Sequence, residues 1–398
     1  MIKLIHTADL HLGIGLSDLY ETPQIVQQRF NDFVENLKSI KDFAISSNAD
    51  FLILAGDIFH HPRPSSQAFN AFSQIIGEIL KEEIPIIAVL GNHDTTKTSE
   101  MLSYLRGFVN VNLKNFYLFD VASKILLRAK NSNEKVKFIG IPYPHFQSTL
   151  SYSDYVFKVE NKINELLQND EADYNVIVGH IYVEGGKIGS EQRIASLRDY
   201  PLPKSVFERE NVHITCLGHL HTPQKVGNKI FYSGSIERID FGEEGEEKSF
   251  LEIVLGDKIH VTNVKLKLRP MKTIYIKKEE LVNNLNINAT LQNILEKYNV
   301  EEGSLLRIRI KGSDIIRNIS MNQIEKYLYD KKKVLAFKLE EIKEEESLEE
   351  ININTKWNFK EALDEYLKLR YRNENPEVIN KVKFYVEKIM EEVKLNEN

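Results

Sequence analysis

Short apolar runs alternate with amphipathic stretches along the first 265 residues. Runs of continuous hydrophobes predict strands that are buried on both faces, as in a parallel sheet. Hydrophobes at helical spacing over 23–47, which open with Pro23, and again over 65–81, predict helices between these strands. Regular alternation of strand and helix favours an α/β sandwich with a largely parallel sheet and right-handed crossovers.

Five of the apolar runs stop abruptly on polar residues. They are LIHTADLH (4–11), FLILAGDIFHH (51–61), IIAVLGNHD (86–94), NVIVGH (175–180) and HITCLGHLH (213–221). Because parallel strands deliver their carboxyl ends to one edge of a sheet, we expect these polar side chains to share one rim.

The pattern changes after His221. Alternating short strands at 224–233, 249–255 and 258–266 predict a second, antiparallel sheet that faces the first. We therefore assign residues 1–268 to one domain. The RPMK segment that ends at Lys272 is interpreted as a linker.

The remainder of the chain divides into three parts. Residues 273–339 predict a small α+β domain, with a clear strand over 305–312. Residues 340–355 begin with seven glutamates in eleven positions, which is typical of a solvated linker. Two amphipathic helices are expected within 356–398, and either core packing or docking to a partner could explain their apolar faces.

Composition narrows the class of protein. At 398 residues and 42% hydrophobic content the chain is an ordinary globular protein, which excludes disordered and fibrous classes. A net charge of -6 gives no indication of a nucleic-acid partner, so any basic surface must be local. Cys216 is the single cysteine, so no disulfide framework exists; we expect a buried thiol and a reducing cytoplasm. No run of about 18 apolar residues occurs, and we expect a protein that is neither secreted nor membrane-spanning.

The polar residues that end the strands are of types that bind metals. Mixed oxygen and nitrogen ligands without thiolate exclude a structural zinc finger and favour manganese, iron or a similar divalent ion. Seven ligands exceed what one ion needs, so we predict two ions that share Asp57. The candidates are Asp9, His11, Asp57, Asn92, His180, His219 and His221.

Two neighbouring cations suit the hydrolysis of phosphoesters. His93 follows Asn92 directly, so its side chain should point away from the metal and toward a leaving oxygen. We interpret it as a general acid or a charge stabiliser. Each motif is weak alone, because Gly-Asp is a common turn dipeptide and a lone Gly-His is more often structural. Their coincidence carries the prediction.

The same motifs resemble those of a known superfamily. DLH, GDIFH, GNHD, GH and GHLH, in this order, resemble the five motifs of the calcineurin-like metallophosphoesterases across roughly residues 1–265. GDIFHHPRPS (56–65) and YSGSIERIDFGEE (232–244), followed by a small domain and terminal helices, resemble the prokaryotic meiotic-recombination-eleven / SbcD nucleases of double-strand-break repair. The implied fold is a two-sheet metallophosphoesterase sandwich flanked by helices, with a small α+β capping domain and a C-terminal helical pair.

The resemblance also implies roles for residues. One metal would take Asp9, His11, Asp57 and His221, and the other Asp57, Asn92, His180 and His219. His93 would be the catalytic histidine, and His60 would help to position the scissile strand. His61 has no such role, and we interpret it as an exposed loop residue.

Cofactors and partners follow from the same resemblance. It implies two Mn²⁺ ions and a cytoplasmic exonuclease and endonuclease that acts on DNA ends, which the capping domain would contact. The apolar residues near 65–80 and 97–108 could form stripes that face the core or a subunit interface. Because they are many for one core-facing stripe and the resemblance implies a helical-bundle dimer here, we predict a homodimer through these helices, with Phe69, Leu102 and Leu105 as interface residues. Residues 356–398 would bind the coiled-coil base of an ABC-type ATPase of the RAD-fifty/SbcC type.

Two other functions stay open. A small-substrate phosphodiesterase or a protein phosphatase could use the same rim, but it would not need the additional domain and terminal helices. A catalytically idle scaffold that bridges DNA ends would not need a complete set of metal ligands. Hydrolysis of DNA compared with that of a small phosphodiester would separate the three.

Overall fold

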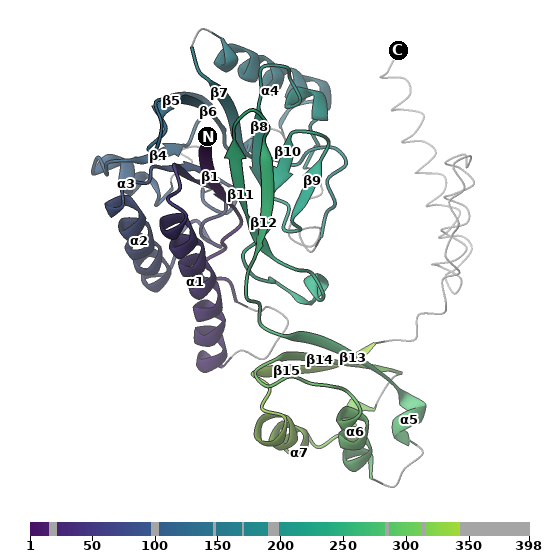
Figure 1. The fold of residues 1–398 in the computed structure, drawn as a ribbon. Helices are drawn as coiled ribbons and strands as arrows, with labels where there is room; N and C mark the ends of the chain where they lie inside the picture. The colour runs from purple at the N-terminus through teal and green to yellow at the C-terminus, as the bar shows by residue number, and fades with distance from the viewer. Residues whose placement is uncertain are drawn as a thin grey trace, which may run out of the picture. The chain divides into compact units, whose positions relative to one another are not determined.

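The computed structural model describes residues 1–15, 22–96, 103–145, 149–168, 171–189, 199–282, 286–312 and 315–342. Of these, all but 311–312 and 341–342 belong to one compact unit. Its strands form two six-stranded sheets and one three-stranded sheet (Figure 1). None of the helices in the described ranges combines the length and the apolar character that a transmembrane span requires.

The first large sheet is built mainly on parallel strands. Its order is β12-β11-β1-β2-β3-β4, and β1 to β4 are parallel while β11 and β12 add antiparallel pairs beside β1. The strands are β1 (Ile2–Thr7), β2 (Phe51–Ala55), β3 (Ile86–Val89), β4 (Phe116–Phe119), β11 (Ser249–Leu255) and β12 (His260–Lys265).

The second large sheet has the order β5-β6-β7-β8-β10-β9, with parallel strands from β6 to β10 and an antiparallel strand at each edge. Its strands are β5 (Ser123–Arg128), β6 (Lys135–Ile141), β7 (Tyr174–His180), β8 (Ile214–Gly218), β9 (Gln224–Val226) and β10 (Ile230–Tyr232). The expected α/β sandwich of two sheets is confirmed.

The prediction that residues 224–266 make their own antiparallel sheet was wrong. The stretch 224–233 divides into β9 and β10, which extend the second sheet, whereas β11 and β12 extend the first. Strand β11 pairs with β1 and buries side chains on both of its faces, so tertiary packing decides which sheet it joins. Alternation along the sequence reports that a strand exists, not which neighbour it pairs with.

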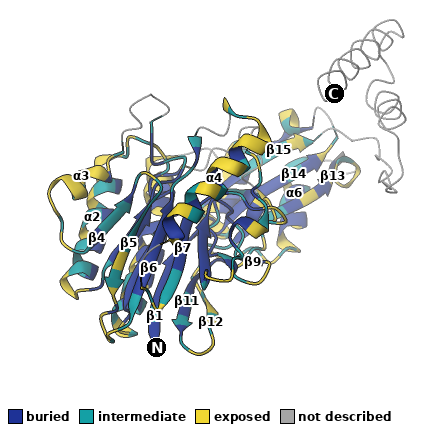
Figure 2. Cartoon of the chain, turned by 90° about the horizontal axis from the view of Figure 1, so that it is seen from above, coloured by how far each residue is buried: buried dark blue, intermediate teal, exposed yellow. Residues whose placement is uncertain are grey.

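Three layers of apolar side chains hold the sandwich together. Between the sheets lies a cluster that includes Phe51, Ile87 and Cys216, whose thiol is buried as expected. Helices α1 (Pro23–Ser46) and α2 (Ser66–Lys81) cover the outer face of the first sheet, and α4 (Tyr152–Leu167) covers that of the second. Figure 2 shows the strands of both sheets largely buried and the outer sides of α3 and α4 exposed.

Helix α1 begins where its sequence predicts. The hydroxyl of Thr22 accepts a hydrogen bond from the backbone N–H of Ile25, and Pro23 occupies the first turn, where no N–H is needed. Helix α2 begins in the same way, because the hydroxyl of Ser65 accepts from the N–H of Ala68.

The helix expected near 97–108 is described only as the short α3 (Arg106–Asn110). Leu102 lies outside the described residues. Leu105 has no exposed surface and packs in the chain's own core, so it was wrong as an interface residue. Phe69 is partly buried and stacks on Phe108, with 5.4 Å between ring centroids.

The third sheet has the order β13-β14-β15. Its strands β13 (Met271–Lys277), β14 (Leu305–Lys311) and β15 (Ala336–Ile342) pack on an apolar cluster of their own. The helical elements around it are α5 (Lys278–Val282), α6 (Ile287–Glu296), α7 (Met321–Lys326) and a π-helical turn over Tyr327–Lys331. Strand β15 continues to Ile342, three residues into the segment 340–355 that was expected to be an acidic linker. Residues 356–398 lie outside the described part of the chain.

The RPMK segment is more firmly held than a linker. The guanidinium of Arg269 donates to both carboxylate oxygens of Asp32 on α1, at 2.6 and 2.5 Å. The same side chain donates to the carbonyl of Gly303 at 2.6 Å. Strand β13 already begins at Met271, whose side chain is buried. This bidentate ion pair therefore fixes the start of β13 to helix α1.

Candidate dinuclear metal centre

All seven candidate ligands lie where central strands end. Asp9 and His11 follow β1, Asp57 follows β2 and Asn92 follows β3. His180 is the last residue of β7, and the remaining two histidines follow β8. Six of the seven side chains are buried and Asn92 is half-buried. The polar ends of strands from both large sheets thus meet at one rim.

The backbone is constrained at this rim. Asp9, His11, Asp57 and His219 have φ of 51°, 39°, 52° and 97°, in the left-handed region that side chains other than glycine rarely adopt. In the described part of the chain only nine non-glycine residues have positive φ, so the candidate ligands make up almost half of them. Such conformations persist where the surrounding structure imposes them, and they cluster at functional sites.

Two glycines give the ligands room. A Cβ atom on Gly91 would lie 2.1 Å from the Oδ1 atom of Asp57. A Cβ atom on Gly218 would lie 2.1 Å from the carbonyl oxygen of Ala55. Two heavy atoms that are not bonded to each other cannot approach to 2.1 Å. The rim can therefore pack this tightly only because neither position has a side chain.

The first group of ligand atoms surrounds His11. Its Nε2 atom lies 3.2 Å from Nε2 of His221 and 3.7 Å from Oδ2 of Asp57. Ligand atoms of Asp9, His11 and His221 all lie within 4.8 Å of one another.

The second group surrounds Asn92. Its Oδ1 atom lies 3.1 Å from Nε2 of His180 and 3.2 Å from Nδ1 of His219. Nε2 of His180 is also 3.3 Å from Oδ2 of Asp57.

Asp57 lies between the two groups. Its Oδ1 atom accepts a hydrogen bond of 2.8 Å from the backbone N–H of His93, which leaves Oδ2 facing both His11 and His180. Burial alone would raise the pKa of this carboxyl, but the charges of His180 and His93 hold the pKa well below its usual range. Oδ2 of the ionised carboxylate therefore faces both groups.

The arrangement of protons fits divalent cations. Nδ1 of His180 donates to the carbonyl of Ala55 at 2.8 Å, so the lone pair of this imidazole is on Nε2. Nδ1 of His221 lies 3.1 Å from Oε1 of Glu243, and Nε2 of His219 lies 3.3 Å from Oδ2 of Asp199. Each contact assigns the N–H to the outer nitrogen and turns the other nitrogen's lone pair inward, as histidine ligands of metals require.

A proton competes with a cation at His180. Burial lowers the pKa of this imidazole, but the carboxylate of Asp57, followed by that of Asp9, raises it to about 9. A cation at Nε2 must therefore displace a proton, and metal affinity at this position increases with pH.

The two predicted catalytic histidines lie beside the first group. Nδ1 of His93 donates to the carbonyl of His60 at 2.7 Å. This hydrogen bond fixes the orientation of the imidazole and does not involve Nε2. The rings of His60 and His93 stack with centroids 5.1 Å apart, and Nδ1 of His60 lies 3.3 Å from Nδ1 of His11. Burial, followed by the charge of His93, lowers the pKa of His60 to about 3, so this imidazole is neutral.

Sequence reasoning missed three carboxylates that hold the rim. Asp94 accepts hydrogen bonds from the backbone N–H groups of Ile58, Phe59 and Gly91 at 2.9, 3.1 and 2.9 Å. It ties the loop after β2 to the loop after β3, and its place directly after Asn92-His93 was the available signal.

The other two carboxylates support histidines. Glu243 lies in the segment 232–244 and forms a fully buried ion pair of 2.9 Å with Lys248 while contacting His221. Asp199 accepts from the hydroxyl of Tyr143 and contacts His219. Asp199 belongs to the polar, glycine-bearing segment 184–200, a composition that predicts a functional loop but does not distinguish Asp199 from its neighbours.

Comparison with known proteins identifies the family. Among solved structures, the chain is similar to GAP50, the anchor in the inner membrane complex of Plasmodium, at 15% identity and TM-score 0.38, over 66% of this chain and 84% of that one. A dimetal phosphatase from Danio rerio matches at 10% identity and TM-score 0.37, over 66% and 95%. Likeness at this level carries no argument about substrate. Residues 2–223, however, match the family model of the calcineurin-like phosphoesterases, whose fold binds two metal ions. That match spans more than half of the sequence, and the chain belongs to this family of metal-dependent phosphoester hydrolases.

Proposed function

We propose that the chain is a dinuclear-metal-dependent DNA nuclease, with exonuclease and endonuclease activity, that processes double-strand breaks together with a coiled-coil ABC-type ATPase. The observation that carries this proposal concerns the segment 232–244. Glu243 in this segment supports His221, while the ring of Phe241 lies 4.6 Å from the guanidinium carbon of Arg307 on β14. One short turn thus supports a metal ligand and anchors the small sheet, a connection that a small-molecule hydrolase does not need.

The chain's own residues have distinct tasks in this proposal. Asp57 would hold both ions, and the other candidates would hold one each. When bound, the ions supply water activation and neutralise charge on the displaced phosphoryl group. His93, fixed by the carbonyl of His60, would give a proton from Nε2 to the leaving oxygen. The neutral imidazole of His60 would face the scissile strand.

The decisive experiment compares two substrates. Purified protein is incubated with linear duplex DNA and, separately, with an aryl phosphodiester, each with and without Mn²⁺. We expect Mn²⁺-dependent degradation of DNA. Hydrolysis of the small ester alone would favour a small-substrate phosphodiesterase, and no reaction with either substrate would favour an idle scaffold.

We also propose that two copies associate through the helices near 65–80 and 97–108. In this region Tyr104 is 51% exposed and contacts Phe69 at a centroid distance of 6.2 Å. Val109 and Val111, just after this region, are 43% and 73% exposed. Val109→Asp with Val111→Asp should give a folded monomer by light scattering. The matched control is Val26→Asp, at an exposed position of α1. An unchanged mass in the double variant would contradict the dimer.

The partner ATPase would dock on residues 356–398. Trp357, Tyr366 and Tyr385 offer large apolar anchors of the kind that dominate helix docking. Truncation at Ser347 should leave Mn²⁺-dependent cleavage of single-stranded DNA intact and eliminate co-purification with the ATPase. Loss of cooperative unfolding or of bound metal in the truncated chain would place these helices in the core instead.

A further inference from the structure

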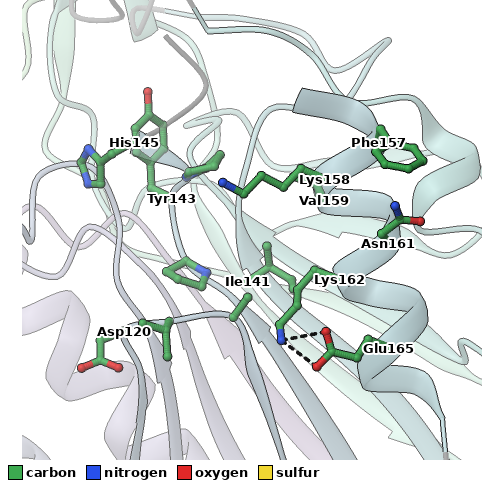
Figure 3. A pocket seen from close by; sticks show the side chains of 14 residues that line it. Asp120, Ile141, Tyr143, His145, Phe157, Lys158, Val159, Asn161, Lys162 and Glu165 are labelled. Atoms are coloured by element: carbon green, nitrogen blue, oxygen red, sulfur yellow. Dashed lines mark hydrogen bonds and ion pairs between the residues drawn. The ribbon is translucent and has the colours of Figure 1, made fainter. Parts of the chain in front are cut away.

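Figure 3 shows the residues that line a cavity, whose volume is about 770 Å³. It lies between the turn that joins β4 to β5, the residues after β6, and helix α4. Most of its lining is apolar, with Val121, Ile141, Pro144 and Phe157 among its residues. A volume of this size is typical of small-molecule sites, which reach roughly 300–1,000 Å³.

One residue belongs to both the cavity and the metal centre. Tyr143 lines the cavity, and its ring centroid lies 5.6 Å from that of His219 and 6.3 Å from that of His180. Its hydroxyl donates to Asp199, the carboxylate that contacts His219, and its backbone N–H donates to the carbonyl of Leu90 at 2.9 Å. Tyr143 is therefore held by Asp199 and Leu90, and its ring lies against two of the candidate ligands.

The polar lining combines four nitrogen-bearing side chains (Lys158, Lys162, His145 and Asn161) with two carboxylates, of which Asp120 pairs with Arg106 and Glu165 with Lys162. Lys158 extends from α4 toward Tyr143, and Lys162 pairs with Glu165 at 2.8 and 3.0 Å (Figure 3). His145 also lines the cavity, and its ring lies 4.9 Å from that of Tyr143. Aromatic faces with lysines beside them are the combination that binds single-stranded nucleic acids, because bases stack on the rings and phosphates pair with the cations.

We propose that this cavity receives an unstacked nucleobase of the DNA strand that is cut, within two nucleotides of the cleaved bond. The proposal rests on the proposed nuclease function. Because Tyr143 both lines the cavity and lies against His219, a strand that is cut at the metal centre would place the base of a neighbouring nucleotide at the cavity. Only an unpaired base can leave the stack, and the cavity would therefore favour single-stranded or frayed ends over closed duplex.

The proposal can be tested without metal, because a base would stack on the aromatic residues of the cavity and not on an ion. A series of single-stranded oligonucleotides carries one fluorescent aminopurine base at successive positions from the end, and binding is measured in the presence of a chelator. Stacking in the cavity should quench the fluorescence at one position. Phe157→Ala should remove this quenching and weaken binding between about 5-fold and 150-fold, the effect of losing one base stack. Phe157 is 66% exposed, so its truncation should leave the fold intact.

A matched control lies on the same helix. Tyr152 is an exposed aromatic of α4 outside the cavity lining, and Tyr152→Ala should leave both quenching and affinity unchanged. With Mn²⁺ added, Phe157→Ala should raise KM for single-stranded DNA, whereas Tyr152→Ala should leave this KM unchanged.

The outcomes separate the cavity from the proposed function. Cleavage of DNA with no position-dependent quenching, or with quenching that survives Phe157→Ala, would overturn the base site and leave the nuclease standing. Absence of DNA cleavage and of DNA binding would overturn both. Faster hydrogen exchange in α4 after truncation at Ser347 would show that the chain's own C-terminal segment covers the cavity, and would also overturn the base site.

Discussion

The metal rim and the three-stranded sheet use the same kind of strand in opposite ways. Around the rim, β1, β2 and β8 are followed by candidate ligands with positive φ, and the chemistry lies at or just beyond the end of each strand. In the small sheet, β14 alternates buried Ile308 and Ile310 with Arg309, which pairs with Glu340 on β15 at 2.5 Å. In the described part of the chain, every trio of side chains that could hold a metal lies at the rim. Whether functional residues follow a strand depends more on where the strand ends in the fold than on the residues within the strand.

The strongest test of this contrast removes the oxygen that both groups share. Asp57→Ala should empty the rim of both ions and abolish hydrolysis, because Oδ2 faces His11 and His180 at 3.7 and 3.3 Å. Elemental analysis of purified protein would measure the loss. Two ions per chain in the variant would refute the shared role of Asp57.

His93→Ala should cost about 100-fold to 10,000-fold in rate, the usual contribution of one acid–base group. Both ions should remain, because Nδ1 of His93 is bound to the carbonyl of His60 and all seven candidate ligands stay in place, although a ligand atom of His93 lies within 4.8 Å of one of His11. Loss of an ion in this variant would move His93 into the ligand set.

A smaller effect on metal binding is expected from Glu243, which contacts the candidate ligand His221. Glu243→Gln weakens the contact that holds His221 and should lower metal affinity by about 10-fold to 100-fold. Glu246→Gln is the matched control, since Glu246 also pairs with Lys248 but has no contact with His221. Equal losses in the two variants would attribute the effect to Lys248.

The smallest effect should come from the other region. Lys331 and Lys332 hold the pKa of the exposed Glu296 at about 2. A carboxyl whose folded pKa is lowered contributes stability above its ordinary pKa of 4.5, and this contribution is lost as pH falls toward 2. Glu296→Gln should therefore lower the thermal midpoint slightly at pH 7, with a difference from the parent chain that disappears in acid. A difference that persists at pH 2 would contradict this origin.

These two regions also differ in how far sequence could predict them. Asp57 and His180 were predictable because each ends an apolar run, a pattern visible along the chain. Asp94, Glu243 and Asp199 were not, since their roles depend on hydrogen bonds to partners that only the fold brings near. Leu105 failed for a related reason. Helical spacing indicates an apolar face without indicating whether that face meets the chain's own core or another copy.

The two glycines of the rim have a consequence for genetics. In a saturation screen for lost phosphoester hydrolysis, every substitution at Gly91 or Gly218 should score as a null allele, since a Cβ atom there would lie 2.1 Å from Asp57 or Ala55. Such a map would mark as essential two positions that contribute no functional group. Loss-of-function alleles in this chain therefore outline the space that the site needs as well as the atoms that act in it.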